Sequence, residues 1–131
     1  APMMILRDGN LCWALGLPGG LRIFPSALQA IVNLIDHGMT LQQAIEAPRI
    51  WTEGHKLEIE QALKPRAEAL SARGHLVHVM PHVGGGMNAI AMSADGAMEG
   101  AACWRADGTV AALGGGCARP GVRFWPGHAP D

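Results

Sequence analysis

The chain has 131 residues, of which 49% are hydrophobic and only 16% are charged, so it is long enough for one domain with a sizeable core. Ten Lys and Arg residues against eleven Asp and Glu residues give a formal net charge of −1, which argues against nucleic-acid binding. No apolar run approaches the roughly 20 residues that span a bilayer, so we expect no membrane span. The first residues also lack the pattern of a signal peptide.

A β-hairpin is predicted at the start of the chain, with strands over residues 3–8 and 11–16. Asp8-Gly9-Asn10 joins the strands, because Gly and Asn tolerate the positive φ angles of a tight turn. The hairpin leads into Pro18-Gly19-Gly20, which we call the glycine corner.

An amphipathic helix follows the glycine corner, and it begins near residues 20–22 because Pro25 is tolerated only in a first helical turn. Gly38 is typical of the residue just after a helix. Six apolar residues recur at helical spacing and are predicted to form one buried stripe. They are Ile23, Ala27, Leu28, Ile31, Leu34 and Ile35.

The rest of the chain predicts a second, short helix and then mixed structure. Thr40 and Gln43 fit a capping box that opens the helix, and Pro48 ends it at Ala47. The later predictions are an extended pair over 49–60 turning at Glu53-Gly54, a helix from Pro65 to Arg73, a strand over 75–80, a hairpin over 88–104 turning at Asp95-Gly96, and a turn with a short strand over 105–113.

This order of elements predicts an α+β fold, or one half of a layered sandwich. Residues 1–114 form the predicted domain. Periodicity ends at Gly114, and the Gly- and Pro-rich residues 115–131 are predicted to be a poorly ordered tail.

The glycine corner is the first candidate site. The first N–H groups of a helix lack partners and lie at the positive end of its dipole, which suits a carboxylate, a phosphate or an oxyanion. The alternative is a simple tight turn, which a short Gly motif favours on physical grounds alone. The motif is not a phosphate loop, because no Lys followed by Ser or Thr comes after it. Residues 84–86, three glycines, are predicted to be a loop or hinge.

Other candidates carry weaker signals. His78 and His82 would share one strand face, with His75 opposite, so a metal site with a third ligand from elsewhere is a minor alternative. The three candidate serines, Ser26, Ser71 and Ser93, lie outside any GxSxG motif. The three cysteines, Cys12, Cys103 and Cys117, include no CxxC pair and are interpreted as buried or incidental thiols.

Two expectations concern charged residues. Glu58 and Glu60 alternate with Leu57 and Ile59, so both glutamates are predicted on the solvated face of a strand. Asp36 lies near a helix C-terminus, where a negative charge is disfavoured. We therefore expect a partner for it and nominate Arg49.

A set of motifs in fixed order carries a family resemblance. They are Asp8-Gly9, Gly16-x-Pro18-Gly19-Gly20-x-Arg22-Ile23, Leu28-Gln29, Val32-Asn33, Ile35-Asp36-x-Gly38 and Ala44-x-x-Ala47-Pro48-Arg49. With them the chain resembles the C-terminal part of the small subunit of the gamma-glutamyltransferase (gamma-glutamyltranspeptidase) family. The resemblance covers about residues 1–113 and is strongest over residues 1–50.

The resemblance implies an N-terminal nucleophile hydrolase, an αββα sandwich of antiparallel strands with helices packed on the sheet. Family precursors cleave themselves, and the freed Thr attacks the amide of a small gamma-glutamyl substrate such as glutathione. The acyl group then passes to water, an amino acid or a dipeptide. By this resemblance Pro18, Gly19 and Gly20 contact substrate, and Gly19 and Gly20 donate backbone N–H groups to the oxyanion hole. The resemblance implies no cofactor and no metal.

The resemblance also implies partners, because the chain begins at Ala1 and not at Thr. The nucleophile, the acidic substrate-binding residues and a Ser-Ser pair are expected upstream, in the large subunit and the N-terminal part of the small subunit. This chain alone is therefore expected to be inactive. Family members are often periplasmic or extracellular, but the location of this one is unknown.

The chain departs from the family at two places. Leu21 stands where Ser is usual, and Cys103-Trp104-Arg105 stands where Asp-Pro-Arg is usual. These departures leave room for a different acyl substrate. The non-enzymatic alternative is a stand-alone domain that binds a small carboxylate at Gly19-Gly20.

Overall fold

The computed structural model describes residues 1–112, so the predicted tail over residues 115–131 lies outside the described residues. Within residues 1–112, no helix is long and apolar enough to cross a membrane.

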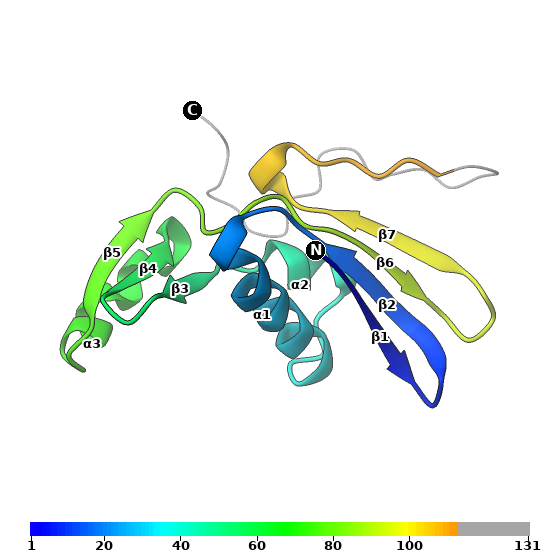
Figure 1. Ribbon diagram of the computed structural model, residues 1–131, viewed down its shortest axis with the longest axis horizontal. Helices are drawn as coiled ribbons and strands as arrows, with labels where there is room; N and C mark the ends of the chain where they lie inside the picture. Colours follow the sequence, from blue (N-terminus) through cyan, green and yellow to red (C-terminus); the bar gives the residue numbers. More distant parts are fainter. Residues whose placement is uncertain (113–131) are drawn as a thin grey trace.

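Two β-sheets lie on either side of a pair of helices (Figure 1). Sheet A is antiparallel in the order β1-β2-β6-β7, and sheet B has the order β3-β4-β5. The strands are β1 (Pro2–Arg7), β2 (Asn10–Gly16), β3 (Ile50–Thr52), β4 (Lys56–Glu60), β5 (Leu76–Met80), β6 (Asn88–Met92) and β7 (Met98–Ala102). The helices are η1 (Gly20–Arg22), α1 (Ile23–Ile35), α2 (Leu41–Glu46), η2 (Gln61–Arg66), α3 (Ala67–Ser71) and η3 (Trp104–Ala106).

Local sequence signals account for most of these elements. Asp8 and Gly9 have φ angles of 53° and 81°, so the predicted first hairpin has the turn that matches strand twist. The capping box is confirmed, because the Gln43 N–H donates to Thr40 Oγ1 at 3.3 Å and the Thr40 N–H donates to Gln43 Oε1 at 3.0 Å. Gly38 has a φ of 60°, as its position after α1 predicts.

Two predictions about the second half are wrong in extent. The predicted helix from Pro65 to Arg73 is the end of a 3-10 helix through Arg66 and then the five-residue α3. The α-helix begins only after Pro65, which an α-helix tolerates only in its first turn. The prediction of a short strand after η3 is also wrong within the described residues, which show only the turn. One strand pair, β4 with β5, is parallel, whereas the family resemblance implies antiparallel strands.

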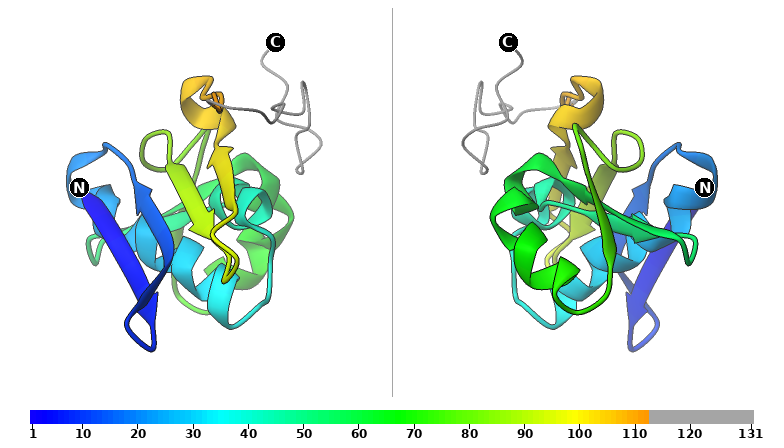
Figure 2. Two further views of the ribbon diagram at one scale, coloured as in Figure 1. Left: turned by 90° about the vertical axis from the view of Figure 1, so that its right-hand side faces the viewer. Right: turned by 90° about the vertical axis from the view of Figure 1, so that its left-hand side faces the viewer.

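The core lies where α1 and α2 pack on one face of sheet A (Figure 2). Its buried members are Leu15, Leu17, Ala27, Ala30, Leu34, Leu41, Ala44, Ile45, Met87, Ala89, Ala101 and Cys103. The predicted single stripe on α1 is wrong in part, because Leu28 and Ile35 are 49% and 52% exposed. The helix instead buries the small side chains of Ser26, Ala27 and Ala30, which let it lie close to the sheet.

The opposite face of sheet A carries an apolar groove of about 760 Å³. Residues of all four strands line it, and it extends along β2 as far as Pro18. Met4 on β1 and Met98 on β7 are 70% and 72% exposed. An α+β fold with helices packed on one face of a sheet is therefore confirmed, and the other face remains open in the described chain.

Removal of the Thr40 hydroxyl tests the capping box. We expect Thr40→Ala to lower the free energy of unfolding by about 1 kcal/mol, because the N–H of Gln43 loses its acceptor. Urea unfolding of both proteins measures the difference. Thr40→Ser keeps the hydroxyl and is the matched control; an equal loss in both variants would contradict a capping role.

Candidate active site

The glycine corner is an exposed turn between β2 and η1. Gly19 and Gly20 have φ angles of 139° and 58°, which favour glycine at both positions. Within residues 1–112 the backbone N–H groups of these two glycines have no hydrogen-bond partner, while the carbonyl of Gly19 accepts from the Arg22 N–H at 3.1 Å. The corner therefore offers two unpaired N–H donors to an oxyanion or a carboxylate.

A second glycine segment packs against the corner. Residues 84–86, the triglycine loop, lie between Val83 and β6, and the Gly85 N–H donates to the Pro18 carbonyl at 3.1 Å. A Cβ atom on Gly85 would lie 2.6 Å from Pro18 Cγ, and one on Gly19 would lie 3.2 Å from the Gly85 nitrogen. The predicted loop is confirmed, and its contacts show that the two glycine segments fit together backbone against backbone.

Ser26 of α1 lies beneath this junction. Its hydroxyl is 2.9 Å from the position that a Cβ on Gly84 would take. The residue is 1% exposed, and within the described chain its Oγ has no hydrogen-bond partner. No imidazole or carboxylate in the described chain bonds to this hydroxyl, so the structure gives Ser26 a packing role and no general base.

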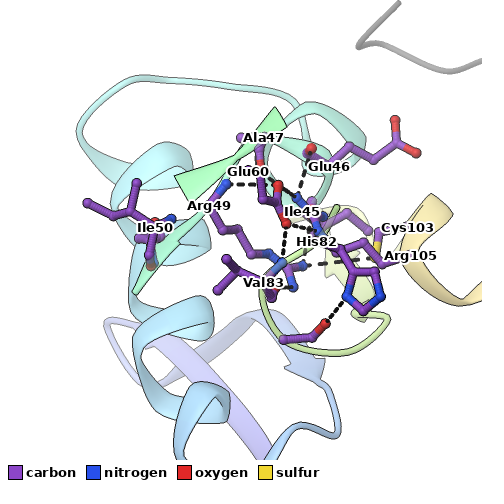
Figure 3. Close-up of polar contacts among 12 residues, drawn as sticks. Ile45, Glu46, Ala47, Arg49, Ile50, Glu60, His82, Val83, Cys103 and Arg105 are labelled. Atoms are coloured by element: carbon purple, nitrogen blue, oxygen red, sulfur yellow. Dashed lines mark hydrogen bonds and ion pairs between the residues drawn. The ribbon is translucent and has the colours of Figure 1, made fainter. Parts of the chain in front are cut away.

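Three charged side chains beneath the triglycine loop form the buried charge cluster: Arg49, Glu60 and Arg105 (Figure 3). Arg49 is 2% exposed and Glu60 is 0% exposed. The two Glu60 oxygens accept from Arg105 Nε at 2.7 Å and from the Arg49 backbone N–H at 2.9 Å. The cluster therefore joins the segment between α2 and β3, the end of β4, and η3.

The buried charge cluster also holds the triglycine loop in place. Arg49 Nη1 donates to the carbonyls of Val83 and Gly85 at 3.2 and 3.0 Å, and the Val83 N–H donates to Glu60 at 2.7 Å. Arg105 Nη1 and Nη2 donate to the carbonyls of Ile45 and Ala47. Each charge is satisfied by directed hydrogen bonds, as burial requires.

Burial and the neighbouring charges act differently on the two guanidinium groups. Burial, with the positive charge of Arg105, lowers the pKa of Arg49 to about 10. Burial alone would lower the pKa of Arg105 as well. The hydrogen bonds to Glu60 and the negative charge of Glu60 have the larger effect, so the pKa of Arg105 is raised. Because the folded pKa of Arg49 is depressed, its burial cost is present at neutral pH and is relieved only above about pH 10.

The buried charge cluster corrects two sequence predictions. Glu60 is not on a solvated face, because the triglycine loop and η3 cover that end of β4. Arg49 is not the partner of Asp36: the side chain of Arg49 contacts the triglycine loop, and Asp36 is exposed at the end of α1. The first prediction relied on the alternation of side chains along a strand and the second on the helix dipole. Both rules depend on neighbours in the chain, and neither predicts that Val83, 23 residues after Glu60, covers that glutamate.

Cys103 also contacts the buried charge cluster, which the sequence did not predict. It is 1% exposed, and its Sγ accepts from the Met87 N–H at 3.0 Å and lies 3.9 Å from Arg49 Nη2. The interpretation as a buried thiol is confirmed for Cys103, while Cys12 is half-buried and Cys117 lies outside the described residues.

The histidine cluster is not formed. His78 lies in β5, His75 precedes that strand, and His82 follows it with Nδ1 3.1 Å from the Gly84 carbonyl oxygen. In the described part of the chain, no group of three His, Cys, Asp or Glu side chains converges as metal ligands would.

Comparisons with known proteins place the whole described chain in one family. The sequence profile of the gamma-glutamyltranspeptidase family matches residues 1–113. The acylase ACY 1 proenzyme of Pseudomonas sp. (strain SE83) is 66% identical over 125 residues, which cover 95% of this chain and 22% of the proenzyme. The glutathione hydrolase proenzyme of Escherichia coli (strain K12) is 32% identical over 105 residues, 77% of this chain and 18% of the proenzyme.

Solved structures show the same likeness. The cephalosporin acylase from Bacillus halodurans has a TM-score of 0.79 at 30% identity, covering 88% of this chain and 22% of that chain. The gamma-glutamyltranspeptidase from Pseudomonas nitroreducens, complexed with L-DON, has a TM-score of 0.77 at 27% identity, covering 86% of this chain and 61% of that chain. The chain thus spans only part of each of these relatives.

Enlargement of Gly85 tests the backbone packing. We expect Gly85→Ala to lower the free energy of unfolding by about 1–3 kcal/mol, because the new Cβ would lie 2.6 Å from Pro18 Cγ. Gly16→Ala is the control and should cost less, since its Cβ would lie 3.2 Å from the Ala1 carbonyl oxygen, a contact that a shift of a few tenths of an ångström relieves. Denaturant unfolding measures both, and an equal, small loss would mean that the two glycine segments are not tightly packed in solution.

Removal of the Glu60 charge tests the buried charge cluster. We expect Glu60→Gln to destabilise the protein by about 3–5 kcal/mol, because the buried Arg105 guanidinium loses its carboxylate partner. Glu99→Gln changes an exposed carboxylate of β7 and should stay within about 0.5 kcal/mol of the parent. Equal stability of the two variants in urea would refute a structural role for the cluster.

Proposed function

The chain belongs to the gamma-glutamyltranspeptidase family, and on this premise we propose that it is the oxyanion-stabilising segment of an acylase, an enzyme that hydrolyses amides through a covalent acyl-enzyme. The α+β fold is part of the sandwich found in the family's N-terminal nucleophile hydrolases. The observation that carries the proposal is the pair of exposed, unpaired N–H groups at Gly19 and Gly20.

The proposed reaction divides its work between this chain and a nucleophile outside it. A Thr hydroxyl, which gives its proton to the Thr α-amine, attacks the amide carbonyl carbon. The carbonyl oxygen becomes an oxyanion, and the Gly19 and Gly20 N–H groups donate to it. Collapse of this intermediate expels the amine with a proton, and water then releases the acid from the Thr ester. One such donor is worth about 10²–10³-fold in rate.

Ala1, which precedes β1, lies close to the glycine corner. The Ala1 nitrogen donates to the Leu17 carbonyl at 3.2 Å, two residues before Gly19. A segment that continues upstream from Ala1 would therefore begin beside the corner and next to the apolar groove on sheet A. We infer that this open face receives further chain of the parent protein.

A second apolar surface supports the same inference. The outer face of η1 and α1 exposes Leu21, Phe24, Leu28 and Ile35, with exposed fractions of 74%, 67%, 49% and 52%. They lie about one helical turn or two turns apart on one side of the helix. Two large apolar faces on so short a chain are typical of a segment that packs against further protein.

The acyl substrate of the parent is proposed to be that of an acylase, in agreement with the 66% identity to the Pseudomonas acylase. The solved structure of a cephalosporin acylase from Bacillus halodurans, which resembles this chain, supports the same proposal, and the exposed Leu21 adds an apolar surface beside the corner. Gamma-glutamyl transfer or hydrolysis is the second candidate, because glutathione hydrolases are among the relatives.

A substrate panel on the full-length protein tests this proposal. Gamma-glutamyl p-nitroanilide and glutaryl p-nitroanilide share one acyl chain and differ only in the α-amino group. Faster release of p-nitroaniline from the glutaryl compound would support the acylase, and faster release from the gamma-glutamyl compound would support the second candidate. Release from neither, with a small carboxylate bound at the corner in a crystal, would favour the non-enzymatic alternative.

A methyl group at Gly20 tests the corner directly. Gly20 and Gly38 have φ angles of 58° and 60°, and an added Cβ would meet no atom within 4 Å at either position. Both Ala variants should therefore lose about the same stability, roughly 1 kcal/mol. In the full-length enzyme we expect Gly20→Ala alone to lower kcat by about 10²-fold, because the methyl group stands beside the oxyanion donors. Equal kcat in the two variants would remove the corner from the mechanism.

A further inference from the structure

Arg22 follows the glycine corner by one residue and reaches sheet B. Its Nε donates to Glu58 Oε2 at 3.1 Å, and its Nη2 donates to Glu58 Oε1 at 3.0 Å and to Oε2 at 2.9 Å. The guanidinium carbon also lies 3.9 Å from the ring centroid of Trp51 on β3. The side chain is thus held by β3 and β4 at once, and no residue of the buried charge cluster takes part.

The backbone of Arg22 belongs to the corner itself. Its N–H donates to the Gly19 carbonyl at 3.1 Å, and the next N–H, of Ile23, donates to the Gly20 carbonyl. A Cβ on Gly84 would lie 3.7 Å from Arg22 Cβ, so this residue also contacts the triglycine loop. The Gly19 carbonyl shares a peptide group with the Gly20 N–H, so the Arg22 backbone bonds directly to the peptide that carries this donor. The Gly19 N–H shares a peptide group with the Pro18 carbonyl, which accepts from the Gly85 N–H of the triglycine loop that Arg22 contacts.

We propose that Arg22 is a positioning residue, which fixes the orientation of the Gly19 and Gly20 N–H groups by anchoring the corner to Glu58 and Trp51 of sheet B. This inference rests on the proposed function and deepens it. Arg22 touches no reacting atom and acts through the corner. Its contribution is to the geometry of the corner more than to stability. The side chains of Arg22 and Glu58 are 35% and 13% exposed, and partly exposed ion pairs add little to global stability.

Arginine is required for this role by its shape. A planar guanidinium can donate two parallel hydrogen bonds to one carboxylate while its face stacks on an indole ring. These contacts fix the guanidinium in one orientation, whereas a lysine ammonium at the same distance would keep the charge without the planar fork. The charge alone is therefore not sufficient, and Lys should fail to replace Arg22.

Kinetics of the full-length protein test the inference. We expect Arg22→Met, which keeps the aliphatic stem, to lower kcat about tenfold with KM within about twofold, because an oxyanion contact is made only in the transition state. Arg22→Lys should resemble Arg22→Met, and Glu58→Gln should fall between that variant and the parent. The double variant should lose little more than Arg22→Met alone, because the two residues act as a unit.

Arg7→Met is the matched control. Arg7 lies on β1, 5.9 Å from the ring centroid of Trp13, so this variant removes an arginine stacked on a tryptophan far from the corner in the chain. It should leave kcat within about twofold of the parent. An equal loss of kcat in Arg7→Met and Arg22→Met would overturn the inference.

Hydrogen exchange tests the same inference without a substrate. The amides of Arg22 and Gly85 donate to the Gly19 and Pro18 carbonyls, so their exchange reports how firmly the corner is held. In the full-length protein, peptides containing these amides should exchange about tenfold faster in Arg22→Met and be unchanged in Arg7→Met. Unchanged exchange in both variants would overturn the inference. If the parent hydrolyses no acyl amide, the proposed function fails, and this measurement alone still decides the role of Arg22.

Discussion

The buried carboxylate of Glu60, bound by the Arg105 guanidinium and the backbone N–H of Arg49, is the interaction on which the rest of this structure depends. Glu60 bonds to Arg105, to the Arg49 backbone and to the Val83 N–H, and Arg49 bonds to the triglycine loop. Removing three charges from water is expensive, and directed hydrogen bonds to every charge offset that cost. These bonds hold the triglycine loop in place. The Gly85 N–H of that loop donates to the Pro18 carbonyl, so they also support the glycine corner.

The corner itself leaves hydrogen-bonding capacity unused. Two adjacent N–H groups are exposed and unpaired in the described chain, and both glycines have positive φ angles. A turn selected for stability alone would pair these donors or choose a less demanding backbone. The triglycine loop packs closely against the corner backbone, and Arg22 anchors the corner to Glu58. These contacts hold the two donors in place and leave them unpaired. This combination of a rigid support and unsatisfied donors suits the stabilisation of a developing negative charge.

The sequence was sufficient to predict those parts of the structure that depend on residues close together in the chain. The turn at Asp8-Gly9, the capping box at Thr40 and the glycine corner are local motifs, and all three appear where they were predicted. It failed for Glu60, because alternation along β4 predicts a polar face but not the loop that covers it. It failed for Leu28 in a related way, since helical spacing identifies apolar residues but not which of two apolar faces packs on the sheet. The proposed oxyanion role of the corner was suggested by the ordered family motifs, because a lone Gly-Gly pair carries too little information.

The most direct test of the account is a crystal structure of the full-length protein with a tetrahedral acyl analogue, such as an acyl boronate, on its nucleophile. The account predicts that the analogue's oxyanion oxygen lies about 2.7–3.1 Å from the nitrogens of Gly19 and Gly20, with Arg22 still bound to Glu58. An oxygen bound by other donors, with the glycine corner facing solvent or buried against another segment, would contradict it.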